Sequence, residues 1–150
     1  HEEDFNNKHD AVLQDLYEQV KTITAYSGKV LKELSSMYPM VLVSNFYGNI
    51  NVVLREFGLA QYFQDVVESS AVGIRKPDAR IFSLGVKCLG LKPEEVMVVG
   101  DSFYKDVEPA IKIGCHAAWF KGEGWSNKTY DENLPDIIIT DLAQLLDKND

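Results

Sequence analysis

The sequence lacks the features that mark secreted, membrane-spanning and repeat proteins. Its 150 residues contain only two cysteines, Cys88 and Cys115, which are too few for a disulfide framework. We therefore expect free thiols in a reducing, cytoplasmic compartment. No apolar run approaches the roughly 20 residues that span a bilayer, and no internal repeat or low-complexity tract is present. The chain opens with His1 and no signal-peptide pattern follows, so we expect that position 1 is not the start of the gene product.

Basic side chains are also scarce. Fifteen Lys and Arg residues stand against 23 Asp and Glu residues, which leaves a net charge of −8. Such an acidic surface argues against nucleic acid and against an anionic membrane as partners. It leaves a small phosphorylated molecule open, because one lysine or a bound metal ion can reverse the field inside a cleft. With 45% apolar and 25% charged residues, the chain has the composition of one ordinary globular domain.

Short apolar runs alternate with segments of helical spacing. Residues 40–44 and 95–100 are continuous apolar runs, which indicate strands covered on both faces, as in a parallel sheet. Further strands are expected at 65–69, 116–120 and 136–140. Helices are expected at 11–20, after Ser27 as N-cap, at 50–57, 79–89, 107–113 and 142–146. This alternation predicts an α/β fold with a mainly parallel sheet, whose ligands bind outside the carboxyl ends of the strands.

Two carboxylates follow the predicted strand at 95–100. Asp101 comes directly after the strand, and Asp106 stands five residues further on, at the start of the next helix. Each aspartate alone is explained by a turn or by the helix dipole. Two carboxylates that converge at one strand end are costly without a hard cation, and Mg²⁺ prefers such oxygen ligands. The pair therefore favours a magnesium site.

Two other strand ends carry polar residues. Ser44 and Asn45 end the first apolar run and precede a helix, where a hydroxyl, an amide and free backbone N–H groups can hold a phosphate. Lys76 stands before Pro77 and the helix-capping Asp78, and its ammonium can bind a phosphoryl oxygen as a point charge. The alternatives are ordinary turn chemistry for the first pair and a surface lysine for the second.

In this order and spacing, the three elements resemble the haloacid dehalogenase-like (HAD) hydrolase superfamily. Ser44-Asn45 resembles its second motif, Lys76-Pro77-Asp78 its third, and Gly100-Asp101-Ser102 through Asp106 its fourth. The similarity runs from about Tyr26 to the C-terminus. It implies a Rossmann-like, three-layer α/β core and a Mg²⁺-dependent phosphatase that hydrolyses a small phosphorylated metabolite through an aspartyl-phosphate intermediate.

The resemblance also implies a role for each matched residue. Ser44 would bind the transferred phosphoryl group, with Asn45 beside it. Lys76 would stabilise charge on the phosphoryl group and the nucleophile, and Asp101 and Asp106 would hold Mg²⁺. The superfamily also contains metal-free haloacid dehalogenases, which typically lack the Gly-Asp pair of the fourth motif. Because this chain keeps Asp101 beside Asp106, the phosphatase interpretation is preferred.

The first motif of the superfamily has no counterpart in this chain. That motif is an apolar strand ending in Asp-x-Asp, and the sequence contains no Asp-x-Asp. We expect residues 1–24 to be a remnant of a cap helix and linker, and residues 25–150 to be the HAD-like core without its central strand. The chain alone would then be inactive for want of the nucleophile. Exposed strand edges would favour a strand-exchanged dimer or association with a missing N-terminal fragment, and a non-catalytic binding or dimerisation module is the alternative function.

Overall fold

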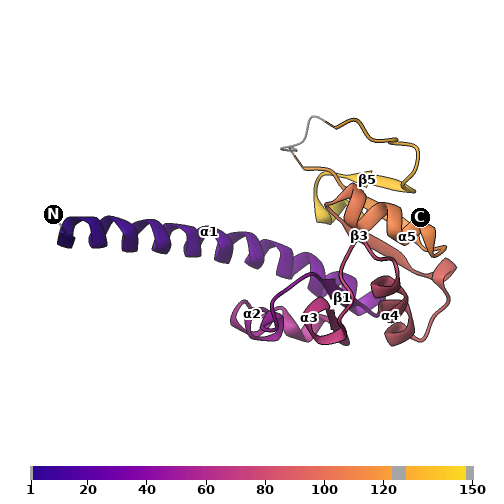
Figure 1. Ribbon diagram of the computed structural model, residues 1–150, viewed down its shortest axis with the longest axis horizontal. Coiled ribbons are helices and arrows are strands. Elements are labelled where there is room, and N and C mark those ends of the chain that lie inside the picture. Colours follow the sequence, from indigo (N-terminus) through magenta and orange to yellow (C-terminus); the bar gives the residue numbers. More distant parts are fainter. Residues whose placement is uncertain (1, 123–127, 148–150) are drawn as a thin grey trace.

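The computed structural model describes residues 2–122 and 128–147, and for residues 2–10 it describes the backbone alone. It begins with one continuous helix, α1, which spans Glu2–Met37 (Figure 1). The predicted helix start at Ser27 is therefore wrong. Ser27 and Gly28 are weak helix formers, but no proline interrupts residues 2–37, and the Thr24 hydroxyl bonds back to the Val20 carbonyl inside the helix.

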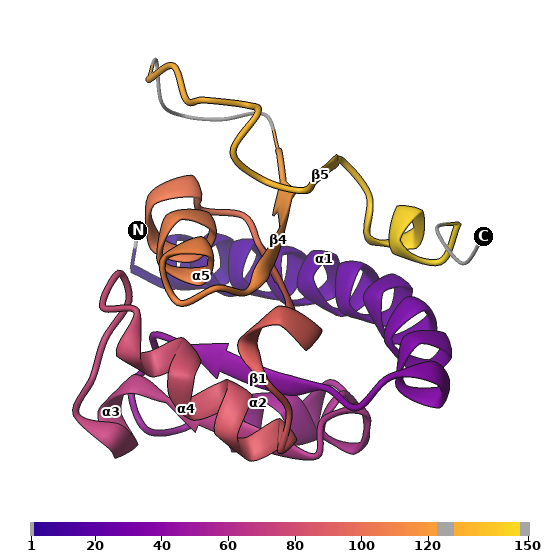
Figure 2. The same ribbon diagram turned by 90° about the vertical axis from the view of Figure 1, so that its right-hand side faces the viewer.

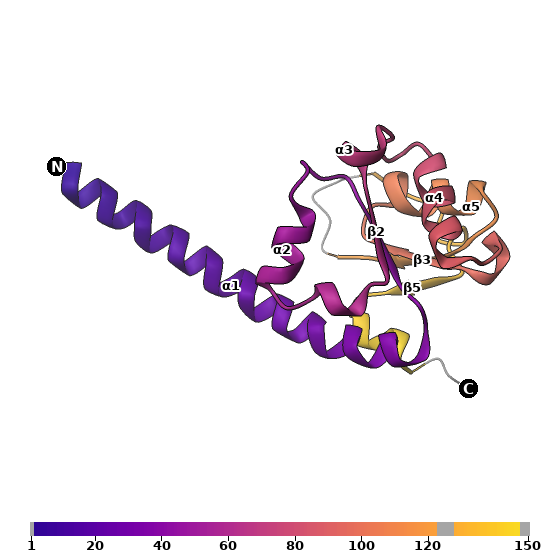
Figure 3. The same cartoon turned by 90° about the horizontal axis from the view of Figure 1, so that it is seen from below.

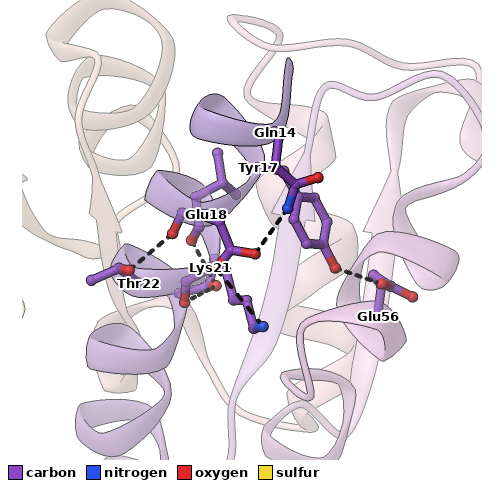
Figure 4. Close-up of polar contacts among 8 residues, drawn as sticks. Gln14, Tyr17, Glu18, Lys21, Thr22 and Glu56 are labelled. Atoms are coloured by element: carbon purple, nitrogen blue, oxygen red, sulfur yellow. Dashed lines mark hydrogen bonds and ion pairs between the residues drawn. The ribbon is translucent and has the colours of Figure 1, made fainter. Parts of the chain in front are cut away.

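Only the C-terminal part of α1 is packed into the body of the molecule. Val30 and Leu34 are buried, whereas the N-terminal half extends away from the strands (Figures 1 and 3). Close to the point where α1 leaves the body, the Tyr17 hydroxyl donates to Glu56 Oε1 at 2.9 Å (Figure 4). The Tyr17 ring also lies 5.9 Å from that of Phe57. Among the described residues, neither α1 nor any other helix is long and apolar enough to cross a membrane.

The strands form two parallel sheets. In the first, β1 (Val41–Ser44) pairs with β2 (Asp65–Glu68). In the second, the order is β3 (Met97–Gly100), β4 (His116–Phe120) and β5 (Ile137–Ile139). The predicted α/β class with parallel strands is confirmed. Within the described ranges no ladder joins β1 to β3, so each of these two strands has a strand neighbour on one side only.

This open position corrects one prediction. The apolar runs predict strands covered on both faces, but all four residues of β1 are only half-buried. In β3, the residues Met97 and Val99 are 44% and 41% exposed. The physical reason is that each strand pairs on one side only among the described residues, because an apolar strand is buried on both faces only when the sheet and its covering helices continue around it.

Helices lie against these sheets (Figures 1–3). The α-helices are α2 (Ile50–Glu56), α3 (Ser69–Val72), α4 (Arg80–Leu89) and α5 (Glu108–Lys112). Short helical turns lie at Ala60–Tyr62, Pro93–Glu95 and Leu142–Leu145, and a π-helical turn at Phe103–Val107. The predicted helices at 50–57, 79–89, 107–113 and 142–146 thus correspond to observed helical segments.

The core joins the two sheets through α4. Ile81 and Phe82 pack with Val67 of β2, whereas Val86 belongs to a second cluster with Phe103 and Val107. Val98 of β3 packs against both clusters. The two sheets are thus held together by side-chain packing where backbone pairing is absent. Cys88 and Cys115 are free thiols, as predicted, and burial raises the pKa of Cys115.

His116 and Asp136 form a contact between β4 and β5. They lie at the amino ends of these two strands. His116 Nδ1 lies 2.9 Å from Asp136 Oδ1, and Asp136 Oδ2 accepts from the Ala117 backbone N–H at 2.8 Å. The hydrogen bond to Asp136 raises the pKa of His116 above its ordinary 6.5. The hydrogen bond from the Ala117 backbone N–H lowers the pKa of Asp136 below 3.8, and the hydrogen bond to His116 lowers it further.

This pair gives the stability of the fold a pH dependence. The His116 contribution is fully present below its unfolded pKa of 6.5 and is lost as pH rises through the raised folded value. The Asp136 contribution is present above 3.8 and is lost as pH falls through the lowered value. We expect His116→Gln to reduce the loss of unfolding free energy between pH 6 and 9, measured by urea titration. An unchanged pH profile in this variant would contradict the assignment.

Candidate functional site

The second and third motif segments are joined by the Asn45 side chain. Asn45 follows β1, and its Nδ2 donates to the Lys76 carbonyl at 3.1 Å. Its Oδ1 accepts from the Lys76 backbone N–H at 2.8 Å. Both groups of the amide are therefore used to hold one residue of a segment that lies 31 positions away in the sequence. This bridge fixes the backbone of Lys76 beside the carboxyl end of β1.

The Lys76 side chain then reaches the fourth motif. Its ammonium donates to Asp106 Oδ1 at 2.7 Å, and the two side chains are only 16% and 5% exposed. Asp106 Oδ2 accepts from the Ser102 backbone N–H at 3.0 Å. Lys76 Nζ also lies 5.9 Å from the centroid of the Phe82 ring. A nearly buried ion pair thus links the segment between α3 and α4 to the segment that follows β3.

Gly100, the last residue of β3, provides the space for Asp106. A Cβ atom on Gly100 would lie 2.6 Å from Asp106 Oδ2 and closer still to Asp106 Cβ and Cγ. The first atoms of the Asp106 side chain are fixed by the π-helical turn at Phe103–Val107, so they cannot move aside as a flexible chain end would. The glycine of the predicted fourth motif therefore has a steric role at this position.

Asp101 has a different environment. Its side chain is exposed, and its carboxylate has no hydrogen-bond partner among the described residues. Its backbone carbonyl accepts from Trp119 Nε1 at 3.1 Å. The Trp119 ring is buried and lies edge-on to Phe103, with centroids 5.1 Å apart. The backbone of Asp101 is therefore held, while its carboxylate is available to a ligand.

The Asp101 carboxylate fits a hard cation. Mg²⁺ usually takes one or two protein carboxylates and keeps several waters. The free carboxylate of Asp101 matches that requirement, whereas both oxygens of Asp106 already accept hydrogen bonds. Across the described part of the chain, no group of three or more His, Cys, Asp or Glu residues could enclose a metal ion. Any cation here would thus need waters or oxygens from its ligand in addition.

Ser44 lies at the carboxyl end of β1, in register with Glu68 of β2. Its hydroxyl makes no hydrogen bond within the described residues, so the structure places it near Asn45 without linking it to Lys76 or Asp106. Sequence reasoning missed Glu68, whose carboxylate is buried and accepts from the Gly48 N–H. The available signal was a single charged residue directly after the apolar pair Val66-Val67.

Residues 2–114 match the model of the haloacid dehalogenase-like hydrolase family. Over 90 residues the chain is 34% identical to the glyceraldehyde 3-phosphate phosphatase of Pyrococcus furiosus, an alignment covering 59% of this chain and 38% of the relative. Over 117 residues it is 35% identical to the 5-amino-6-(5-phospho-D-ribitylamino)uracil phosphatase YigB of Escherichia coli, covering 77% and 48%.

A solved structure gives the same result. The fold matches the HAD phosphatase from Thermococcus onnurineus with a TM-score of 0.70 and 29% identity, over 79% of this chain and 54% of that one. The matched region spans less than half the length of both curated relatives. With the family match covering most of the chain and the parallel α/β core in place, the chain belongs to the haloacid dehalogenase-like hydrolase family.

Proposed function

We propose that this chain carries the phosphoryl-binding and metal-binding part of a Mg²⁺-dependent phosphatase for a small phosphorylated metabolite. The observation that carries the proposal is the Lys76–Asp106 ion pair, held at the carboxyl ends of β1 and β3 by the Asn45 bridge. The relatives described above are phosphatases whose names specify small phosphorylated compounds. Both lines of support point to a phosphate monoester as the substrate.

Lys76 would bind the phosphoryl group. An ammonium has three N–H donors, of which one points to Asp106, so the others are available to phosphoryl oxygens. Its positive charge would stabilise the negative charge that develops during phosphoryl transfer. The Ser44 hydroxyl, and Asn45 beside it, would complete the binding site from the β1 side. Asp106 keeps the ammonium in place in the absence of substrate.

Asp101 would supply a carboxylate ligand to Mg²⁺, with Asp106 beside it as the second acidic group. When bound, the ion neutralises charge on the phosphoryl oxygens. The contribution of this chain is to hold the Asp101 backbone through Trp119, so that the carboxylate points from a rigid strand end. The same free carboxylate disfavours a metal-free dehalogenase, which needs no cation.

The aspartyl-phosphate route needs a nucleophile that this chain does not contain. No Asp-x-Asp is present in the sequence, and the absence of a ladder between β1 and β3 among the described residues supports the proposal that a central strand is missing. We therefore propose that the chain alone is inactive. In this proposal residues 1–24 belong to a cap and linker and residues 25–150 to the core. Helix α1 runs unbroken through that boundary, so the proposed division separates two functional roles and does not mark a structural break.

An assay on the isolated chain tests this proposal. With p-nitrophenyl phosphate and Mg²⁺ we expect no turnover, whereas inorganic phosphate should bind, and Lys76→Met should weaken that binding by about tenfold or more. Lys76→Arg keeps a positive charge and should weaken phosphate binding less than Lys76→Met does. Turnover that depends on Lys76 would contradict the absence of a nucleophile, and phosphate binding unaffected by Lys76→Met would contradict the site.

The second candidate is a non-catalytic binding or dimerisation module. The single-sided pairing of β1 and β3 favours it, because open strand edges attract a partner strand from a second copy or from a missing N-terminal fragment. Sedimentation equilibrium distinguishes the two candidates when combined with the phosphate titration. A stable dimer that does not bind phosphate would favour the module.

A further inference from the structure

Glu68 is a buried charged residue with no role in the site described so far. Glu68 is the last residue of β2 and is only 7% exposed. Its partner in the register of the two strands is Ser44 of β1. Glu68 Oε1 accepts from the Gly48 backbone N–H at 2.6 Å. Burying a carboxylate is costly unless hydrogen bonds compensate for its lost hydration. The short bond to Gly48 provides such compensation and ties Glu68 to the loop that follows β1.

The next residue holds the same loop at a second point. The Ser69 hydroxyl accepts from the Phe46 N–H at 3.2 Å and lies 3.3 Å from the Phe46 carbonyl, to which it can donate. Ser69 is also buried, at 6% exposure. Two adjacent residues at the end of β2 therefore hold Phe46 and Gly48, which are two positions apart. Gly48 itself has a φ of +99°, a conformation that side chains rarely adopt.

This arrangement holds the loop after β1 from two sides. The Phe46 N–H and carbonyl contact the Ser69 hydroxyl, and the Gly48 N–H donates to Glu68 Oε1. The Asn45 side chain is bound to Lys76. The loop is thus held between Glu68 and Ser69 on one side and the Lys76 segment on the other.

We propose that Glu68, together with Ser69, is a positioning residue for phosphate binding. The pair sets the conformation of residues 44–48, so that the Ser44 hydroxyl lies beside the phosphoryl-binding position and the Asn45 side chain stays bound to Lys76. Glu68 does not touch that group, since its oxygen is directed to the Gly48 amide. The inference rests on the proposed function, because it concerns the same phosphoryl-binding site.

The test is a titration of the full chain with inorganic phosphate, in which amide NMR shifts and calorimetry measure the binding. We expect Glu68→Ala to weaken phosphate binding by about tenfold. Glu68→Gln keeps an oxygen that can accept from Gly48 and should restore affinity to within about threefold of the original. Glu95→Ala is the matched control, because Glu95 Oε2 also accepts a backbone bond, from Lys92 at 2.8 Å, far from the site. It should leave phosphate affinity unchanged.

Each outcome decides the matter. A folded Glu68→Ala variant with unchanged phosphate affinity would overturn the positioning role while leaving the proposed function intact. A wild-type chain that does not bind phosphate would overturn the proposed function and this inference with it. If Glu68→Ala does not fold, Ser69→Ala replaces it: weaker phosphate binding supports the inference, and unchanged binding overturns it.

Discussion

Replacing Asp106 with alanine is expected to lower the free energy of unfolding by about 3 kcal/mol, because it breaks a nearly buried ion pair from one side. Lys76 would keep its charge in a position where its side chain is only 16% exposed. The Ser102 N–H would lose its acceptor as well. Urea denaturation, monitored by circular dichroism, measures the change.

A double-mutant cycle separates the pair from its surroundings. Lys76→Met removes the charge and keeps a chain of similar length, so the combination of Lys76→Met with Asp106→Ala should cost less than the sum of the two single changes. Asp106→Asn should lie between wild type and Asp106→Ala, because its amide oxygen can still accept from Ser102. Strict additivity of the two single changes would show that Lys76 and Asp106 are not coupled.

Replacing Gly100 with alanine is expected to cost about 2 kcal/mol of stability through overpacking. The new Cβ would collide with Asp106 at its Cβ and Cγ atoms, which the π-helical turn keeps in place. The collision can be relieved only by a shift of this turn, which would move the Asp106 carboxylate away from Lys76, so phosphate affinity should fall together with stability. Urea denaturation and the phosphate titration follow the two effects separately.

Gly28→Ala is the matched control for this change. Gly28 lies inside α1, and a Cβ there would meet Leu59 Cδ2 at 3.3 Å, the end of a flexible side chain. Alanine is a better helix former than glycine by about 1 kcal/mol, so this variant should be as stable as wild type or more stable. Equal losses for both glycines would contradict a specific contact between Gly100 and Asp106.

Local patterns in the sequence predicted the strands well and the helix ends less well. The apolar run at 40–44 and the segments at 65–69, 95–100, 116–120 and 136–140 all contain observed strands. Ser27 was expected to start a helix because serine is a common N-cap, yet it lies inside α1. A cap preference is local, and it is overridden where the residues on both sides continue the helix and no proline stops it.

Site residues that end a strand could be predicted from the sequence, whereas contacts between residues far apart in the sequence could not. Ser44 and Asp101 follow apolar runs, so their place at the carboxyl ends of β1 and β3 could be expected from the pattern. The ion pair between Lys76 and Asp106 joins residues 30 positions apart, and no periodicity encodes such a contact. For the same reason Glu68 was missed, since its partner Gly48 lies 20 positions away.

The central claim is that Asp101 couples a magnesium ion to phosphate binding beside Lys76, and the most direct measurement is a calorimetric titration of the chain with inorganic phosphate, with and without Mg²⁺. The account predicts that Mg²⁺ strengthens phosphate binding by about tenfold and that Asp101→Asn, which removes one charge at an exposed position, abolishes this enhancement while the fold is retained. Phosphate binding that does not respond to Mg²⁺, or an enhancement that persists in Asp101→Asn, would contradict the claim.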